Sequence, residues 1–287
     1  MDTARRIAIL GMIVSSLLAI LKLTVGWLAH SASLSADGFE STADVFASGL
    51  VLIGLTLAAR PADENHPYGH GRFEILTGLM LGFLLLSAGC AIAWHGLTGA
   101  ADESRVPAAY AIWPLVVSII VKLGMVSVKY KQARHIGSDS LMADATNDAI
   151  DMLSGVVALV ALSLTLHDPA RFLRADHYGA FVVGLIVIAT ALRIMYHSSM
   201  HLTDTMPDDD SMKQIRAVAM NVPDVAGVEK CFARKTGLKY HVDLHLEVDP
   251  EISVRESHEI ATRVRIQICR ELPWVEDVLV HVEPSRN

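Results

Sequence analysis

Acidic residues inside long apolar stretches are the first chemical feature of this sequence. The stretch from residue 34 to 55 is long and apolar enough to span a bilayer, yet it contains Asp37, Glu40 and Asp44. At about 100° per residue, these three acids fall on one face of a helix. Because ionisable groups at membrane depth are costly and rare, this face predicts a functional site. The alternative is an ordinary buried helix whose acids form salt bridges with a neighbouring helix.

A second apolar stretch, from residue 141 to 166, contains a matching polar stripe formed by Asp144, Asn147, Asp148 and Asp151. If the two stretches span in opposite directions, Glu40 and Asp44 lie about ten residues from the outer end of one helix. Asn147 and Asp151 then lie about ten residues from the inner end of the other. The two pairs are therefore expected to meet near the middle of the membrane.

Such a meeting would build a cage of four oxygen ligands from Glu40, Asp44, Asn147 and Asp151. A cage of this kind suits a divalent cation, and when empty its carboxylates repel each other and bind protons instead. Metal and protons then compete for the same oxygens, which is a physical basis for exchanging one for the other.

The remaining polar residues of these helices have other possible roles. Asn147 could instead form an interhelical hydrogen bond. Asp144 and Asp148 fit cavity lining or proton relay as well as metal ligation. Asp37 lies one turn nearer the outside than Glu40, so we expect it to line an exit cavity.

Two further groups are rich in histidine. The segment ARPADENHPYGHGRFE holds Asp63, His66 and His70, and its proline and glycines favour a loop over a helix. A loop cluster of histidine and aspartate can bind zinc-like metals, although solvated loop residues look the same. In YHVDLHLEVDP, strand alternation places His241 and His245 on one polar face.

The strand VLVHVEP repeats this alternation with His281 and Glu283, and His258 lies on the helix between the two strands. These side chains would form a metal site if they converge, and an ordinary solvent-facing sheet surface if they do not.

Composition indicates what must position these groups. The chain has 287 residues, of which 52% are hydrophobic and 19% charged, and its mean hydropathy is +0.39, which predicts an integral membrane protein. Six segments reach the ~20 residues that a bilayer requires. They are about Ile7 to Leu28, Leu34 to Ala58, Phe73 to Leu97, Ala108 to Val128, Leu141 to Leu166 and His177 to Met200.

Charge and cysteine content exclude other classes. A net charge of −7 without a basic run argues against a nucleic-acid partner. Three widely spaced cysteines provide neither a disulfide framework nor a thiolate zinc site. The apolar run from Ile7 to Ala29 is too long for a signal-peptide core, so we expect it to be retained.

Basic residues beside the spans predict the orientation. With a cytoplasmic N-terminus, the inner loops hold Arg5, Arg6, Arg60, Arg72, Lys129, Lys131 and Arg134, and the outer loops hold Arg105, Arg171 and Arg174. Because basic residues favour the cytoplasmic side, both termini are predicted to be cytoplasmic.

After Asp204 the sequence takes on the pattern of a soluble domain. We expect a helix at 208–220, strands at 228–235 and 238–248, a helix at 254–271 and a strand at 276–283. The order αββαβ predicts a small α+β domain with its helices on one face of a three-stranded sheet. The predicted division is therefore 1–206 for a transmembrane domain and 207–287 for a cytoplasmic domain whose thin core favours dimerisation or metal binding.

Taken together, these motifs resemble the cation diffusion facilitator family over essentially the whole chain. ADGFESTAD resembles the family motif of the second span, and the pair Asn147 and Asp151 resembles that of the fifth. HPYGHGRFE is similar to the family's specific HPYGHGK-E loop. The resemblance assigns transport-site roles to Glu40, Asp44, Asn147 and Asp151, and a loop site to Asp63, His66 and His70. It assigns a cytoplasmic site to His245, His258, His281 and Glu283, with His241 as a possible accessory.

The resemblance also implies a fold and a function. It implies six transmembrane helices followed by a metallochaperone-like domain, a homodimer, and a charge interlock of Arg72 with Asp204 at the dimer base. The implied function is efflux of divalent Zn²⁺, Mn²⁺ or Fe²⁺-class cations across the cell (inner) membrane by proton antiport and alternating access. Zinc-transporting members usually carry a histidine in the intramembrane site, so Glu40 and Asn147 favour Mn²⁺ or Fe²⁺ here.

Two alternatives belong to other functional classes. A metal-sensing scaffold or partner subunit with the same fold would transport little while keeping much of the sequence. An intramembrane hydrolase is disfavoured, because the sequence holds no HExxH, no GxGD pair and no nucleophile with a base at a useful spacing. We therefore expect a secondary active transporter and not an enzyme.

Overall fold

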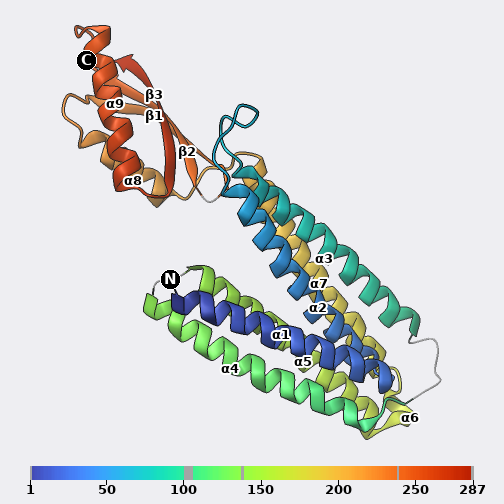
Figure 1. The fold of residues 1–287 in the computed structure, drawn as a ribbon. Helices are drawn as coiled ribbons and strands as arrows, with labels where there is room; N and C mark the ends of the chain where they lie inside the picture. The colour runs from blue at the N-terminus through green and yellow to red at the C-terminus, as the bar shows by residue number, and fades with distance from the viewer. Residues whose placement is uncertain (1, 100–105, 137–138, 238, 286–287) are drawn as a thin grey trace. The chain divides into compact units, whose positions relative to one another are not determined.

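Six long helices form the first part of the structure, a computed structural model that describes residues 2–99, 106–136, 139–237 and 239–285 (Figure 1). They are α1 (Asp2–Leu28), α2 (Ala32–Ala58), α3 (Arg72–Gly99), α4 (Ile112–Ile136), α5 (Asp139–His167) and α7 (Ala175–Leu202). All six are long and apolar enough to cross a membrane, which confirms the six predicted spans.

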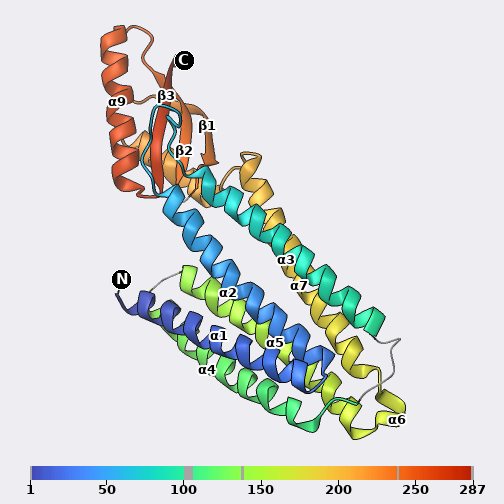
Figure 2. The same ribbon diagram turned by 45° about the vertical axis from the view of Figure 1, so that its right-hand side comes forward.

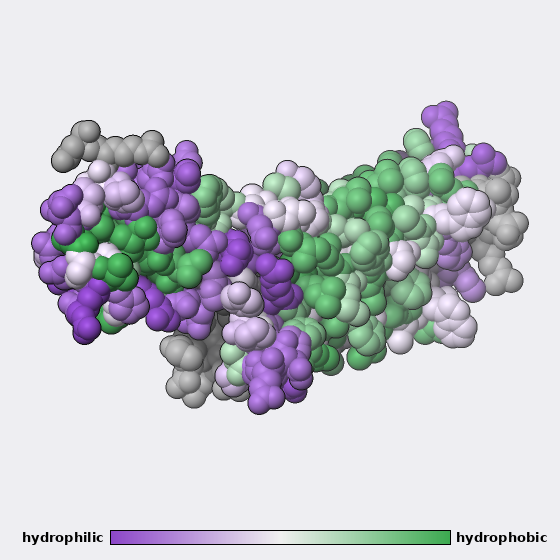
Figure 3. All heavy atoms as spheres, turned by 90° about the horizontal axis from the view of Figure 1, so that it is seen from above, coloured by the Kyte–Doolittle hydropathy of each residue, from purple (hydrophilic) through white to green (hydrophobic). Residues whose placement is uncertain are grey.

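The outer surface of these helices is apolar. Trp27, Phe46 and Trp94 are 78, 69 and 70% exposed, and Figure 3 shows hydrophobic side chains spread over the helices. Water would solvate such a surface poorly, whereas a bilayer solvates it well. The chain is therefore a multi-pass membrane protein.

The chain divides into two compact units. The first consists of Met1–Leu50 and Met80–Ile194, and the second of Val51–Leu79 and Met195–Asn287. The first unit contains the buried acids. The second contains the loop after α2 and the C-terminal domain. Helices α2, α3 and α7 contribute to both units.

A buried aspartate on α7 fixes the start of α2 in the first unit. Asp176, 1% exposed, accepts hydrogen bonds from the backbone N–H of Ala32 at 2.5 Å and from the hydroxyls of Ser31, at 2.9 Å, and Ser33. Its charge faces the positive end of the α2 dipole, where an anion is stabilising. The short helices η1 (Ala109–Ala111) and α6 (Pro169–Phe172) lie in the connections beside α4 and α7.

Helix α4 is longer than the sequence predicted. We expected the fourth span to end at Val128 and Lys129, Lys131 and Arg134 to lie in an inner loop, but α4 continues to Ile136 and all three residues are helical. Lys129 is only 4% exposed, since its ammonium contacts the carboxylate of Asp148 on α5. This ion pair allows a charged residue to remain inside the helix packing, so the loop assignment was wrong.

The C-terminal domain confirms the predicted αββαβ order. Its elements are α8 (Asp209–Met220), β1 (Gly227–Lys235), β2 (Tyr240–Val248), α9 (Val254–Glu271) and β3 (Val275–Pro284). The sheet order is β1-β2-β3, with β1 antiparallel and β3 parallel to β2. Both helices lie on one face of the sheet, as Figures 1 and 2 show.

Strand alternation sets the core of this domain. Val242, Leu244 and Leu246 are at most 1% exposed and pack against Ile215 of α8 and Val264 of α9. The residues between them, from His241 to Glu247, are half-buried and lie on the other face. Helix α9 begins with a capping box, in which the Ser253 side chain accepts from the Glu256 N–H and the Glu256 side chain accepts from the Ser253 N–H.

Replacing Leu246 with alanine tests this core. Because Leu246 is 0% exposed, we expect the free energy of unfolding of the domain to fall by about 2–5 kcal/mol. Denaturant unfolding of the full chain in detergent, followed by Trp274 emission with the other tryptophans replaced by phenylalanine, measures this loss. Leu279→Ala, at a site that is 69% exposed, is the control and should stay within about 0.5 kcal/mol of the parent. Equal losses in both variants would contradict the assigned core.

Candidate metal sites

Helices α2 and α5 bring the predicted intramembrane acids into one region. The Ser154 hydroxyl of α5 donates a hydrogen bond of 2.8 Å to Oε1 of Glu40, and Glu40 and Asp151 are each 6% exposed. The charge of Glu40 interacts with those of Asp151 and Asp44, and Asp44 interacts with Asp151. Among the described residues, Oε2 of Glu40 has no hydrogen-bond partner. A buried carboxylate with an open oxygen beside two other acids can accept a cation.

Two lysines that the sequence reasoning did not assign to the site lie beside these acids. Lys122 of α4 contacts the carboxylate of Asp151, and its Nζ lies 3.4 Å from Oδ1 of Asp148. Lys129, two turns further along α4, contacts the second oxygen of Asp148. Both lysines are at most 4% exposed. Their spacing of seven residues in an apolar helix was the available signal, since it places both ammonium groups on one face.

Asp37 has a different role from the one expected. Its carboxylate lies 2.7 Å from Nζ of Lys22 on α1, and each residue is 1% exposed. Lys22 also donates a 3.0 Å hydrogen bond to the hydroxyl of Ser41. A fully buried ion pair does not line a cavity, so the salt-bridge alternative applies to Asp37 and the exit-cavity expectation was wrong.

The carboxylates of this region do not form a closed ligand set. In the described parts of the chain, two groups of at least three His, Cys, Asp or Glu have ligand atoms within 4.8 Å of one another, and Glu40, Asp44 and Asp151 are not such a group. Asn147 is half-buried on α5. Asp148 is held by the two lysines rather than facing open space. Asp144 is on α5, and its side chain lies outside the described residues.

The loop after α2 does assemble its predicted cluster. Asp63, His66 and His70 have ligand atoms within 4.8 Å of one another. Oδ1 of Asp63 accepts from the backbone N–H groups of Asn65, at 3.0 Å, and His66, at 2.7 Å, so a short turn positions the acid. Nδ1 of His70 lies 3.1 Å from the Pro61 carbonyl oxygen. That contact holds the ring so that Nε2 faces Asp63 at 3.4 Å, the nitrogen a metal would use.

Electrostatics favour an ionised acid in this loop. The pKa of Asp63 is lowered, first by the backbone hydrogen bond from His66 and further by the nearby histidine rings.

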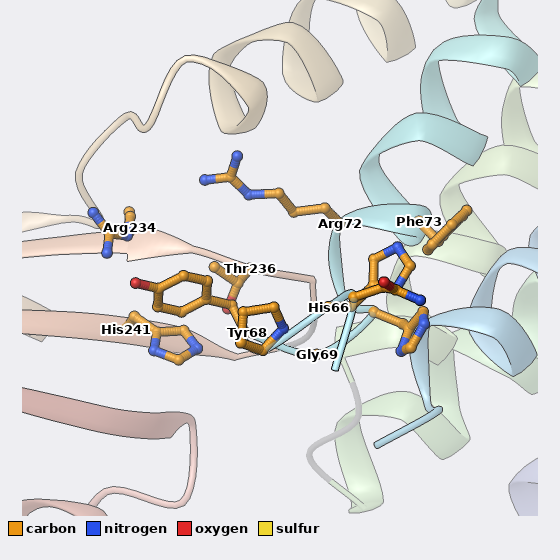
Figure 4. Close-up of a pocket in the computed structure, with 11 residues that line it drawn as sticks. His66, Tyr68, Gly69, Arg72, Phe73, Arg234, Thr236 and His241 are labelled. Carbon is orange, nitrogen blue, oxygen red and sulfur yellow. The ribbon is translucent and has the colours of Figure 1, made fainter. Parts of the chain in front are cut away.

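The loop also borders a pocket of about 440 Å³, where Tyr68 meets the ring of His241 edge-on at 6.1 Å between centroids (Figure 4). A Cβ on Gly71 would overlap the carbonyl oxygen of Thr236, so only glycine permits this close approach.

The C-terminal domain assembles a second cluster. The parallel register pairs His245 with His281, and their ring centroids are 5.0 Å apart. Glu283, two residues along β3, lies 2.5 Å from Nδ1 of His245 and 3.8 Å from Nε2 of His281. The three residues therefore offer two nitrogens and a carboxylate on the open sheet face, a donor set that suits zinc-like ions.

Two other predicted members of this site lie elsewhere. His258 is exposed near the start of α9, and α9 packs on the opposite face of the sheet from His245. His241 shares the strand face with His245 but packs edge-on against Tyr68 of the loop. Among the described residues, the cluster within 4.8 Å contains neither of them.

The predicted charge interlock is present as a contact within the chain. Nη2 of Arg72, at the start of α3, lies 3.3 Å from Oδ1 of Asp204, which follows α7. Both side chains are about half exposed, at 57 and 49%. An exposed pair of this kind contributes little to stability on its own.

Both parts of the chain match domains of one group of proteins. Residues 8–203 match the cation efflux transmembrane domain, and residues 207–285 match the cation efflux protein cytoplasmic domain. Buried acids among spanning helices, followed by a soluble metal-ligand cluster, define a multi-pass cation efflux transporter. The chain belongs to the cation diffusion facilitator family.

Several relatives are similar over nearly the whole chain. The uncharacterized transporter YdbO of Bacillus subtilis is 33% identical over 97% of this chain and 94% of its own length. The manganese efflux system protein MneS of the same bacterium is 30% identical over 93% of this chain and 91% of its own length. Metal tolerance protein C1 of Arabidopsis thaliana is 31% identical over 99% of this chain, which spans 63% of that longer protein. Among solved structures, a cadmium form of the MamM CTD is 29% identical over 27% of this chain and 98% of its own, with a TM-score of 0.27.

The cluster of the C-terminal domain predicts a pH effect. Hydrogen bonds with the side chains of Glu229 and His245 lower the pKa of Glu283 from 4.5 to about 2. The folded domain therefore gains stability from the Glu283 carboxylate above its ordinary pKa and loses that stability as the pH falls from about 4.5 toward 2. We expect the wild type to be more stable than Glu283→Gln at pH 6, with the difference shrinking below pH 4.5. Unfolding curves in chelator at pH 6, 5, 4 and 3 measure it, and a difference that is constant with pH would contradict the assignment.

Proposed function

We propose that this protein exports divalent transition-metal cations from the cytoplasm in exchange for protons, by alternating access in a homodimer. Residues 1–206 carry the transport path, and residues 207–287 bind metal and bring the protomers together. The membrane is the cell (inner) membrane, with both termini in the cytoplasm. Glu40, Asp44, Asn147 and Asp151 hold the travelling ion, and protons take its place on these oxygens when it leaves.

The observation that carries this proposal is the charge of the acidic region in the first unit. Among the side chains that the structure describes, five acids and three lysines interact there: Asp37, Glu40, Asp44, Asp148 and Asp151 with Lys22, Lys122 and Lys129. If all are ionised, the acids exceed the lysines by two charges. One divalent cation or two protons would balance this excess, and an uncompensated excess inside a membrane is costly. The region therefore favours exchange of a divalent ion against protons.

The ligand types favour a hard cation. Carboxylate and amide oxygens suit Mn²⁺ and Fe²⁺, whereas histidine nitrogen suits Zn²⁺. The similarity to MneS, a manganese efflux system protein, supports the same choice. Histidines occur instead in the loop cluster and in the C-terminal cluster, so we propose that these clusters sense zinc-like ions without carrying them.

The exposed pair of Arg72 and Asp204 supports a role at the dimer base. In a homodimer the two copies of this pair would lie where the protomers separate and approach during transport. Because an exposed ion pair can break at little cost, the interlock would guide the protomers without locking them.

Neutralising the acids tests the transport site. We expect Asp44→Ala with Asp151→Ala to abolish metal-dependent proton flux in proteoliposomes, with a loss of at least about 100-fold, because two of the proposed oxygen ligands are removed. Asp209→Ala with Asp210→Ala, at exposed positions of α8, loses the same charge and should keep the parental rate. Metal-dependent flux that persists in the first variant would show that the mechanism is wrong.

A side-by-side ion series tests the metal class and the scaffold alternative. Stopped-flow flux with Zn²⁺, Mn²⁺, Fe²⁺, Co²⁺ and Cd²⁺ should show faster transport of Mn²⁺ or Fe²⁺ than of Zn²⁺, and Glu40→His should shift the preference toward Zn²⁺. Preferential Zn²⁺ flux in the parent would refute the inference from oxygen ligands. No flux of any of the five ions would favour the metal-sensing scaffold.

A further inference from the structure

Lys122 lies where a transported ion would meet Asp151. Its ammonium contacts the Asp151 carboxylate, and the lysine is 2% exposed. A positive charge at this position occupies one of the proposed ligands and repels a divalent cation, because two like charges a few ångströms apart in a region of low dielectric oppose each other strongly. While Lys122 remains in this contact, its charge competes with an ion for the Asp151 carboxylate and weakens binding there.

A second acceptor for the same ammonium lies one helical turn away. Nζ of Lys122 is 3.4 Å from Oδ1 of Asp148, so a small rotation of the lysine side chain would complete that contact and release Asp151. Asp148 is 4% exposed and is held on its other oxygen by Lys129. It is thus a fixed carboxylate with one oxygen turned toward Lys122.

The packing around Lys129 holds Asp148 in place. A Cβ on Gly11 of α1 would lie 3.3 Å from Nζ of Lys129, so glycine leaves room for that ammonium between α1 and α4. With Asp148 held by Lys129, Lys122 has the carboxylates of both Asp151 and Asp148 within reach. The geometry therefore contains two positions for one permanent charge.

We propose that Lys122 is a tethered counter-cation that binds Asp151 in the ion-free protein and transfers to Asp148 when a divalent cation enters. The lysine keeps its charge throughout, so the step involves no proton transfer by Lys122. The inference rests on the transport site proposed above. It adds that metal affinity is set by competition with an internal charge, which makes Lys122 and Asp148 affinity-determining residues rather than ligands.

Equilibrium metal binding tests the switch. The chain carries His66→Ala, His70→Ala, His245→Ala and His281→Ala to remove the other clusters, and Mn²⁺ and Zn²⁺ are titrated separately in detergent at one fixed pH. Lys122→Gln should bind the ion at least about tenfold more tightly, because the competitor is gone. Asp148→Asn should weaken binding, because Lys122 loses its second acceptor and stays on Asp151.

A variant with both Lys122→Gln and Asp148→Asn separates a switch from a general charge effect. If Asp148 acts by accepting Lys122, adding Asp148→Asn to Lys122→Gln changes the metal affinity little. If the two residues act independently, the effects of the two substitutions on the binding free energy add. Lys129→Gln removes the same charge from the same helix without touching Asp151, so its gain in affinity should be clearly smaller. Equal gains in Lys122→Gln and Lys129→Gln, or additive effects in the double variant, would overturn the inference.

The two proposals fail in different ways. If Asp151→Ala leaves the affinity for both ions unchanged, the transport site itself is wrong and the lysine switch falls with it. If Asp151→Ala weakens binding but Lys122→Gln does not tighten it, the transport site stands and only the switch is wrong. If Lys122→Gln does not fold, Lys122→Met replaces it and should likewise bind the ion more tightly. Weaker binding by Asp148→Asn then tests the same switch.

Discussion

Compensation of buried carboxylates by lysines is the constraint on which the helical part of the structure depends. Each of the acids Asp37, Asp148 and Asp151 contacts an ammonium group from a neighbouring helix. A buried acid without such a partner would destabilise the packing by several kcal/mol, so the lysines determine which helices can surround α2 and α5. Helices α1 and α4 are in this sense part of the site.

The acids differ in their nearest partners. Asp37 forms an ion pair of 2.7 Å with Lys22 that joins α1 to α2, whereas Glu40 accepts a hydrogen bond from the Ser154 hydroxyl of α5. The clusters outside the spanning helices are organised differently, since a turn holds Asp63 beside His66 and the parallel pairing of β2 with β3 brings His245 to His281. One chain thus contains a buried region of carboxylates and lysines and two clusters that combine histidine with a carboxylate.

Much of this arrangement was predictable from sequence, and the failures have a common cause. Hydrophobic length predicted all six spans, and the compact HPYGHG loop brought His66 to Asp63. Strand alternation predicted that His281 and Glu283 share a face, but the meeting of His245 with His281 depends on the parallel register of β2 and β3. The exit-cavity role of Asp37 and the loop position of Lys129 were wrong because a single helix does not reveal its neighbour. Partners such as Lys22 and Lys122 come from helices distant in sequence, and the periodicity of one segment cannot identify them.

The Asp176 clamp has a mechanical consequence for α2. Because its first turn is tied to α7 through Ser31, Ala32 and Ser33, a rigid tilt of α2 must pivot near that end. At 1.5 Å per residue, Glu40 lies about 12 Å from the pivot at Ala32, and Leu50, the last residue of α2 in this unit, lies about 27 Å from it. Any such tilt displaces Leu50 roughly twice as much as Glu40. Glu40 is therefore close enough to the pivot that a tilt of α2 moves its carboxylate little.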